Sequence, residues 1–415
     1  MTIWHKAIAG SALGLAAVAL VAAAPANAKV EGDTIIIGSA ISLTGKYSTN
    51  GENTQRGYDL GVKRINEMGG VQVGGKSYKI KIIYYDDESA GARAAQLAER
   101  LIKQDGVKFM LGPYSSGMTK AVAPVTEKYN ILMVESEGAS RSLFTQGFKN
   151  MFAVLSTSEQ YLREAINLAA QIQRKKFKRA SDLTVAIVVE NDPFSLDVRA
   201  GVLEDIERYG MKVVIDDKMP RDLNDISATL TKVRALKPDI LVISGHTKGA
   251  VTAGRQIAEL QIQVPMIAIT HCESAKLIEK YGAAVEGFMC PTQWAETMSY
   301  EGEYFGTARE YFDTYTKEYG EEPPYQAAQA TAAVLVWKDA FERANSFDTD
   351  ALRTALNETD MMTFYGAIRF SKQGNNIAKP MALRQIQDGK LHVIAPTKVA
   401  ARKAIYPRKV NYEGM

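Results

Sequence analysis

The segment Thr184-Val-Ala-Ile-Val-Val189 is apolar at every position after the first and rich in β-branched residues. It lacks the apolar–polar alternation of a strand with one solvent-exposed face. Uninterrupted apolar runs of this kind are typical of parallel strands that are covered on both faces. Eight further apolar segments along the chain are predicted strands: 34–39, 78–85, 109–112, 131–134, 213–216, 240–244, 266–269 and 288–290.

Amphipathic segments separate these strands. In the segment 54–68, spacings of three and four place on one helical face Tyr58, Gly61, Ile65 and Met68. The pair Gly69-Gly70 should end this helix, because glycine adopts the left-handed cap conformation without a Cβ penalty. Similar patterns predict helices over 92–104, 120–129, 159–173, 196–209 and 225–236. Repeated strand–helix–strand units predict an α/β, doubly wound, Rossmann-like architecture.

Two segments repeat one local design. Phe109-Met-Leu-Gly-Pro-Tyr-Ser-Ser-Gly117 and Ile240-Leu-Val-Ile-Ser-Gly-His-Thr-Lys248 both run from an apolar strand through a glycine-containing turn into a helix. Two lobes with similar folds would account for this repeated pattern. Because no low-complexity linker separates the halves, short crossings and a hinge are expected rather than a flexible tether.

Composition is that of an ordinary globular protein. The 415 residues are 46% hydrophobic and 23% charged, which excludes a disordered or collagen-like chain. Lys and Arg number 50 against 47 Asp and Glu, so the balance gives no electrostatic footprint for nucleic acid. This length predicts two to three domains.

Residues 1–28 are predicted to be a secretory signal peptide. Lys6 precedes an apolar run from Ala12 to Ala24, and Ala26-Asn27-Ala28 fits the small-x-small cleavage rule. The alternative is a membrane anchor, but a run of about 13 residues is shorter than the roughly 20 that cross a bilayer. We expect cleavage after Ala28 and a periplasmic mature chain.

Export would place the two cysteines in an oxidising compartment. Cys272 and Cys290 each follow a predicted strand, in consecutive strand–helix–strand order. A disulfide is geometrically allowed if the two strands are neighbours, and the sequence leaves its formation open.

Motifs for catalysis, nucleotides or metals have weak support. The string from Gly70 to Ser77 matches a P-loop, but a helix precedes it and a strand follows it, the reverse of the order that holds phosphates. No G-x-S-x-G, HExxH or CxxC pattern occurs, so we expect no catalytic residue, no cofactor and no metal site. His246 and His271 each follow a predicted strand and could face a shared cleft, which keeps a secreted hydrolase as a minor alternative.

Two segments of the chain are rich in Lys and Arg. The run 174–179 has two interpretations, a solvated helix end or a docking patch for a partner. The basic tail from residue 397 is expected to be an exposed strap.

Strand-to-helix turns are the most informative candidate sites, because open α/β sheets bind ligands beyond the carboxyl ends of their strands. Tyr114, Ser115 and Ser116 end one strand and open a helix. Two hydroxyls with free helix amides can receive a carboxylate, although at least one serine should serve as the helix N-cap. The next turn, 136–140, offers a second group of amides.

At these turns the chain resembles the solute-binding proteins of ABC importers, the type I periplasmic proteins of the leucine/isoleucine/valine-binding family. The resemblance covers the chain after residue 28 and rests on the order and spacing of five strings: Ile37-Gly-Ser-Ala-Ile-Ser-Leu-Thr-Gly45, Arg64-Ile-Asn-Glu-Met-Gly-Gly-Val71, Tyr85-Asp-Asp87, Gly112-Pro-Tyr-Ser-Ser116 and Ala121-Val-Ala-Pro-Val125.

The resemblance implies two α/β lobes joined by three crossovers that close on one small molecule. The first lobe would comprise 29–155 and 295–382, and the second 156–294 and 383–415. The implied ligand-binding residues are Asn50, Tyr114, Ser115, Ser116, Glu137, Gly138, Ala139, Ser140, Phe194, His246, Cys272, Glu273, Tyr325 and Gln326.

Two positions depart from the family pattern. Ala139 stands where relatives usually have threonine, and Cys272 stands at the position of the acidic residue that pairs with a ligand ammonium. Glu273 or Glu137 could take that role, or the ligand is not an α-amino acid. A carboxylate at Glu137 has two equal interpretations, a contact to a ligand amine, amide or hydroxyl, or a salt bridge to Arg141.

The resemblance therefore implies a periplasmic protein that captures an amino acid, or a related small organic acid or amide, for an inner-membrane ABC permease. A monomer is the default expectation, because the sequence does not reveal the oligomeric state. One alternative is a sensor that presents the same ligand to a membrane receptor. Another is a protein that binds aromatic acids rather than amino acids.

Overall fold

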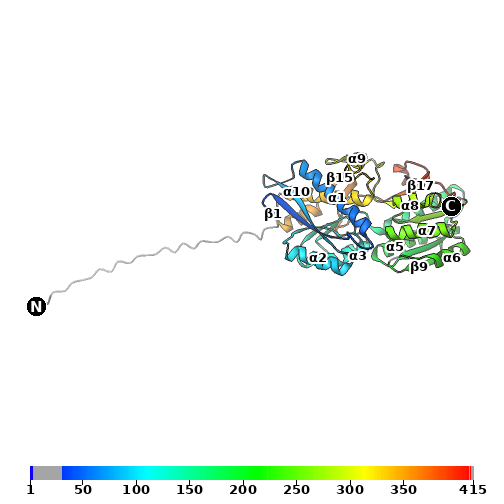
Figure 1. Ribbon diagram of the computed structural model, residues 1–415, viewed down its shortest axis with the longest axis horizontal. Helices are drawn as coiled ribbons and strands as arrows, with labels where there is room; N and C mark the ends of the chain where they lie inside the picture. The colour runs from blue at the N-terminus through cyan, green and yellow to red at the C-terminus, as the bar shows by residue number, and fades with distance from the viewer. Residues whose placement is uncertain (3–29, 222, 411, 413–415) are drawn as a thin grey trace.

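The computed structural model describes residues 1–2, 30–221, 223–410 and 412. Apart from Met1 and Thr2, the predicted signal peptide therefore lies outside the described residues. Two seven-stranded sheets, each with helices packed on it, lie next to one another along the long axis of the molecule (Figure 1). We call them, with their helices, the first and the second lobe. The predicted fold class, two doubly wound α/β lobes, is confirmed.

The first sheet has the strand order β3-β4-β2-β5-β6-β7, with β1 pairing β2. The strands from β4 to β7 along this order are parallel, as their apolar segments predicted. Its strands are β1 (Val30–Glu31), β2 (Thr34–Ile41), β3 (Val71–Val73), β4 (Lys76–Asp86), β5 (Phe109–Leu111), β6 (Leu132–Glu135) and β7 (Met151–Ala153). The strand order reverses direction between β2 and β5, which makes the space beyond their carboxyl ends a switch point where open sheets bind ligands.

The second sheet has the order β18-β17-β12-β11-β10-β8-β9. Strands β9 to β12 along this order are parallel, and β17 and β18 add an antiparallel hairpin. Its strands are β8 (Thr184–Glu190), β9 (Lys212–Met219), β10 (Ile240–Ser244), β11 (Met266–Ile269), β12 (Met289–Thr292), β17 (Ala382–Gln387) and β18 (Lys390–Ala395). Here the switch point lies between β8 and β10.

Helices from distant parts of the chain cover each sheet. On the first lobe lie α1 (Ser48–Glu67), α2 (Gly91–Lys103), α3 (Ser116–Lys128), α9 (Ala308–Tyr319), α10 (Tyr325–Ala344) and α11 (Thr349–Asn357). The second lobe carries α4 (Arg163–Lys175), α5 (Pro193–Tyr209), α6 (Ser227–Leu236), α7 (Thr247–Glu259) and α8 (Ala275–Tyr281). Two small hairpins, β13 (Glu301–Gly302) with β14 (Gly306–Thr307) and β15 (Asp360–Thr363) with β16 (Gly366–Arg369), lie between α8 and β17 in the chain.

The chain passes between the lobes three times: after β7, after β12 and before β17. The second passage brings α10 back against α1, and this contact is close because Gly57 has no side chain. A Cβ at Gly57 would lie 2.2 Å from the backbone carbonyl oxygen of Ala327. Helix α10 is buried on nearly all sides and forms the centre of the first lobe's core.

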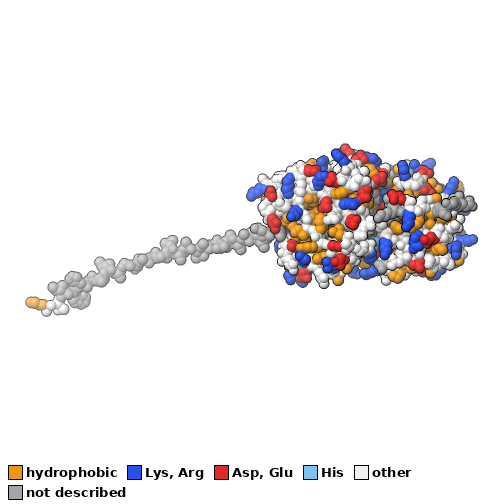
Figure 2. Space-filling view, viewed as in Figure 1, with side chains coloured by type: hydrophobic (Ala, Val, Ile, Leu, Met, Phe, Trp, Pro, Cys, Tyr) orange, Lys and Arg blue, Asp and Glu red, His pale blue; other side chains and the backbone are white. Residues whose placement is uncertain are grey.

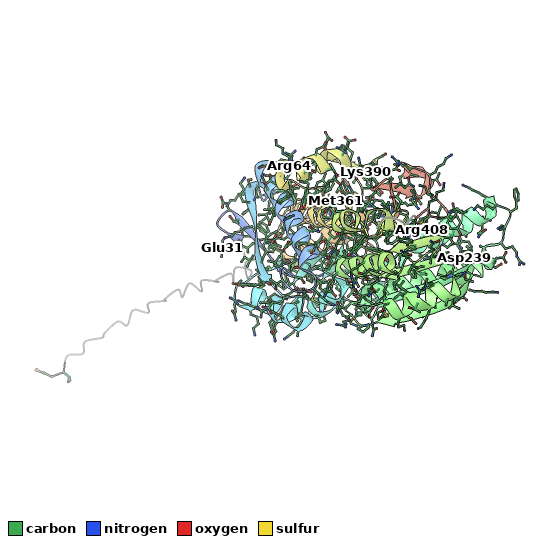
Figure 3. The ribbon with its side chains drawn as sticks, turned by 45° about the vertical axis from the view of Figure 1, so that its right-hand side comes forward. Glu31, Arg64, Asp239, Met361, Lys390 and Arg408 are labelled. Atoms are coloured by element: carbon green, nitrogen blue, oxygen red, sulfur yellow. A yellow bond between two sulfur atoms is a disulfide. The ribbon has the colours of Figure 1, made fainter. Side chains whose placement is uncertain are left out.

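Two local predictions can be compared with the structure. The segment 70–77 is the β3–β4 hairpin with Gly74 and Gly75 at positive φ, so the P-loop match is a tight connection. The expectation of an exposed C-terminal strap is wrong in part, because the Arg408 and Tyr412 side chains are buried on the second lobe. Arg408 donates hydrogen bonds to the Ala284 carbonyl and the Tyr412 hydroxyl, and Figure 3 shows Arg408 and Asp239 on this lobe, away from Arg64 on the first.

Figure 2 shows positive and negative side chains interspersed over the visible face of both lobes. Among the described residues, no helix combines the length and the apolar character needed to cross a bilayer.

Candidate functional site

The turn after β5 sets the first part of the site. Ser115 is the N-cap of α3 at a φ of 80°, and its hydroxyl accepts a hydrogen bond from the Met118 amide at 3.4 Å. The expectation that one serine caps the helix is confirmed. The Ser116 hydroxyl oxygen accepts a hydrogen bond from the Ser140 amide at 2.9 Å, which joins the first turn to the second.

Side chains of both lobes meet at the two switch points. The Tyr114 hydroxyl of the first lobe lies 3.0 Å from His246 Nδ1 and 3.4 Å from His271 Nε2 of the second. The Tyr325 hydroxyl, at the start of α10, lies 3.2 Å from the same His271 Nε2. His246 and His271, which the sequence suggested could face a shared cleft, lie side by side with their ring centres 5.5 Å apart.

The proton positions in this cluster follow from its acceptors. His271 Nδ1 lies 2.9 Å from the Gly245 carbonyl oxygen, to which it must donate. Burial lowers the pKa of His271 to about 3, so the ring is neutral and its Nε2 accepts from the tyrosine hydroxyls. His271 also has a φ of 58°, in the left-handed region that is rare for residues other than glycine and common at functional sites.

Aromatic rings surround these hydrogen bonds. The Phe194 ring, from the start of α5, packs against Tyr161, His246 and His271 with centroid distances of 5.1 to 5.5 Å. Tyr47, from the loop before α1, packs edge-on against Tyr114 and His246. The closed cleft is therefore lined by aromatic rings from both lobes.

Glu137 lies in the second turn and is buried. Its carboxylate accepts hydrogen bonds from Thr54 Oγ1 at 2.9 Å and Gln329 Nε2 at 2.7 Å. Burial raises the pKa of Glu137 well above its ordinary value. Arg141 pairs instead with Glu204 at 3.0 Å, so the predicted alternative of a Glu137–Arg141 salt bridge is wrong.

The amides of the second turn are already hydrogen bonded within the chain. The Glu135 carboxylate, at the end of β6, accepts from the amides of Glu137 and Gly138, and from Thr119 Oγ1 at 3.0 Å. Ala139 is buried and accepts through its carbonyl from the Ser158 amide at 2.8 Å. Burial raises the pKa of Glu135 to about 7.

The outer edge of the cleft is joined by polar contacts between the lobes. The Ser140 hydroxyl donates to the Asp197 carboxylate on α5, and the Ser142 amide donates to the same group at 3.1 Å. Together with the Arg141–Glu204 pair, these contacts join the two lobes along this edge.

A pocket of about 400 Å³ opens between the lobes on another side of the cleft. Its walls include Asn50 and Gln326 of the first lobe with His271, Glu273 and Arg384 of the second. Glu273 Oε1 receives a long hydrogen bond of 3.5 Å from Gln326 Nε2. Within the part of the chain that the structure describes, the buried atoms Glu273 Oε2 and Arg384 Nε have no hydrogen-bond partner.

Cys272 requires a correction. Its sulfur is bonded to Cys290, and its side chain is fully buried in the apolar core of the second lobe rather than at the cleft surface. The disulfide that the sequence left open is therefore present, because β11 and β12 are neighbouring parallel strands.

Several cleft residues were not among the predicted set: Tyr47, Glu190, Asp192, Gln329 and Arg384. Asp192 is the N-cap residue of α5, and its carboxylate accepts a hydrogen bond from the Ser195 amide at 2.8 Å. An Asp directly before a helix is a recognisable N-cap signal in the sequence. The other carboxylate oxygen of Asp192 lies 3.1 Å from His246 Nε2. Burial opposes ionisation of Asp192, but His246 outweighs it and lowers the pKa of Asp192 to about 2.

Comparison with known proteins agrees with this architecture. A family model described as periplasmic binding protein matches residues 34–390. The Leu/Ile/Val-binding protein homolog 7 of Brucella suis is 23% identical over 415 residues, covering 96% of this chain and 98% of its own.

Solved structures of similar fold include two with bound solutes. The substrate binding protein LivJ from Streptococcus pneumoniae, in complex with isoleucine, has a TM-score of 0.76 at 21% identity, covering 88% of this chain and all of its own (100%). A solute binding protein from R. palustris, in complex with benzoate, has a TM-score of 0.75 at 18% identity, covering 89% and 97%.

Proposed function

Because this chain belongs to the periplasmic binding protein family, we propose that it captures a small solute between its lobes in the periplasm and delivers it to an ABC permease. The proposed lobes are 29–155 with 295–382, and 156–294 with 383–415. Contacts across the cleft support closure as the mechanism, since Tyr114 and Tyr325 of the first lobe hydrogen bond to histidines of the second. A solute that contacts both lobes stabilises this closed state by its differential affinity.

The single observation that carries the solute class is the pair of unpartnered charged atoms in the interlobe pocket. Burying a polar atom without a partner costs about 1–3 kcal/mol, and more for a charged group. Glu273 Oε2 and Arg384 Nε are both buried without a hydrogen-bond partner among the described residues, and both side chains line this pocket. A zwitterion would satisfy both, its ammonium on Glu273 and its carboxylate on Arg384. We therefore propose an amino acid or a related small amide as the first solute class.

The pocket size agrees with this class. A volume of about 400 Å³ lies within the usual range of small-molecule sites, roughly 300–1,000 Å³. Asn50 and Gln326 add amide groups that can bind either end of such a solute.

A second class, aromatic acids, is favoured by the rings in the deeper cleft. Tyr47, Tyr114, Phe194 and Tyr325 surround two histidines, and such rings pack well against another aromatic ring. Relatives of similar fold were solved with isoleucine and with benzoate, so the fold accommodates both classes.

A thermal-unfolding screen tests the proposal. The purified chain is screened with branched-chain amino acids, benzoates and small amides. A specific solute at 100 times its Kd should raise the free energy of unfolding by about 2.7 kcal/mol. Absence of stabilisation by every member of these classes would contradict the proposed solute range.

Delivery and location need separate measurements. We propose that the chain acts as a monomer, which light scattering on the purified protein would check. N-terminal sequencing of protein from the periplasmic fraction should begin at Lys29. Solute uptake by vesicles that hold the cognate permease should require this protein, whereas a sensor would leave uptake unchanged.

A further inference from the structure

A second cluster of charged groups lies on the second lobe, beyond the carboxyl ends of β8 and β10. Glu190 ends β8, Asp192 caps α5 with its side chain, and His246 occupies the N-cap position of α7 without a capping hydrogen bond. One potential metal-ligand atom from each of the three lies within 4.8 Å of the others. Their exposed fractions are 2%, 4% and 5%, so the cluster is buried.

The hydrogen bonds within this cluster are incomplete. Glu190 Oε1 receives only a long hydrogen bond of 3.4 Å from the His246 amide. For Glu190 Oε2, the described residues provide no hydrogen-bond partner. Since Asp192 is also a carboxylate and lies beside it, the two groups repel each other unless a proton or a cation lies between them.

The backbone leaves room for the Glu190 carboxylate at two glycines. A Cβ would lie 2.7 Å from Glu190 Oε1 at Gly245 and 2.6 Å from it at Gly249. Glycine at both positions therefore lets the carboxylate lie against the turn and the first residues of α7, where it faces Asp192 and His246.

We propose that Glu190, Asp192 and His246 bind a divalent cation of the zinc class through two carboxylate oxygens and one imidazole nitrogen. In a tetrahedral zinc site with bonds near 2.0–2.1 Å, neighbouring ligand atoms lie about 3.3 Å apart. The Asp192 Oδ2 to His246 Nε2 distance of 3.1 Å is close to this separation. Three protein ligands leave the fourth position open for water or another oxygen donor.

Charge supports a dication over a monocation. An imidazole binds a metal only in its neutral form, so the metal-bound site would carry the two carboxylate charges, which a divalent ion cancels within a buried site. Lys46 also acts on Glu190 electrostatically, and it lies on the first lobe, so its contribution depends on closure.

The cluster is connected to the cleft through His246. With Nε2 on the metal, Nδ1 carries the proton and donates to the Tyr114 hydroxyl oxygen, 3.0 Å away on the first lobe. Tyr47 and Tyr114 cover the imidazole in the closed structure. Lobe opening would expose His246 and give the ion its path of entry.

The test uses the full mature chain after treatment with a chelator and dialysis. Titration with zinc chloride alone, followed by calorimetry and elemental analysis, should show one ion bound per chain. Binding should release protons, because the ligands must be deprotonated. Glu190→Gln and Asp192→Asn should each weaken binding by at least about 10-fold, the lower end of the loss seen even for outer-shell partners.

Glu164→Gln serves as the matched control, because Glu164 is a partly buried carboxylate on α4 of the same lobe and should leave zinc binding unchanged. Failure of the wild-type chain to take up zinc would overturn the proposal, whatever the variants do. Equal zinc affinity in the wild type and in a folded Glu190→Gln protein would also overturn it. Zinc uptake does not depend on the solute, so it can fail while the proposed function stands.

Discussion

Replacement of Glu273 by glutamine separates two effects that we propose for its carboxylate, binding of the solute ammonium and destabilisation by a buried charge. The side chain keeps its volume and its contact with Gln326, but the buried negative charge is removed. Glu273 Oε2 has no hydrogen-bond partner among the described residues, and burial raises the pKa of Glu273, with Arg384 partly opposing this. The ionised carboxylate therefore destabilises the described structure.

The two measurable consequences have opposite signs. Loss of a charge-assisted hydrogen bond to a solute ammonium costs about 1.5–3 kcal/mol, so the Kd for an amino acid should rise about 10- to 150-fold. Removal of the unpartnered charge should leave the free energy of unfolding of the empty protein unchanged or raise it by about 1–3 kcal/mol. Relative to Glu273→Gln, the wild type should also lose stability as pH rises from the ordinary carboxyl range toward the raised pKa of Glu273.

Titration calorimetry and chemical unfolding at neutral pH measure the two quantities on the same samples. Benzoate, which has no ammonium, should bind the variant and the wild type with similar affinity. Glu164→Gln again provides the control and should leave amino-acid binding unchanged. Unchanged amino-acid affinity in Glu273→Gln would refute the assignment, and a parallel loss of stability and affinity would show structural damage instead.

Three further predictions concern the framework of the site. The pKa of Glu135, about 7, lies above the ordinary value of 4.5, so between these pH values the folded state holds a proton that the unfolded state has lost. The free energy of unfolding of the wild type should therefore fall as pH rises from 4.5 to 7, relative to that of Glu135→Gln, in paired unfolding curves. Replacing Cys272 and Cys290 by serine removes a disulfide between residues 18 positions apart and should lower the free energy of unfolding by about 3 kcal/mol. A reductant should then have no further effect on thermal unfolding of this variant. Gly57→Ala should lower the free energy of unfolding by about 1–3 kcal/mol or more, because its Cβ would lie 2.2 Å from the α10 backbone. Gly91→Ala is the control: the nearest atom to its Cβ is 3.4 Å away, so the same denaturant titration should show no change in stability.

Much of the fold could be predicted because most of the parallel strands carry mainly apolar sequences, whereas β4 and β9 also contain charged residues. Every predicted strand has an observed counterpart, and the predicted helices differ from the observed ones mainly at their ends. Helix α10 was missed because it is buried on nearly all sides and so has no amphipathic period. The β17–β18 hairpin was missed because buried Gln385 and Gln387 break its apolar pattern, and their amides bind the C-terminal tail, as at the Ile405 and Lys403 carbonyls.

The site could be predicted where a residue follows a strand in the chain. Tyr114 and His246 follow β5 and β10, and the structure brings them together across the cleft. Arg384 could not be found this way, because it lies on a strand that the pattern did not reveal. The family resemblance implied that Cys272 lies in the cleft, but its disulfide with Cys290 directs its side chain into the core.

We propose that a solute binds between the two lobes and contacts both. A crystal structure of the protein with the solute found in the screen would show this binding site. We expect solute density in the interlobe pocket, with the ammonium or amide within hydrogen-bond distance of Glu273 and the acidic end toward Arg384. Density on the outside of one lobe, with the cleft closed and empty, would contradict it.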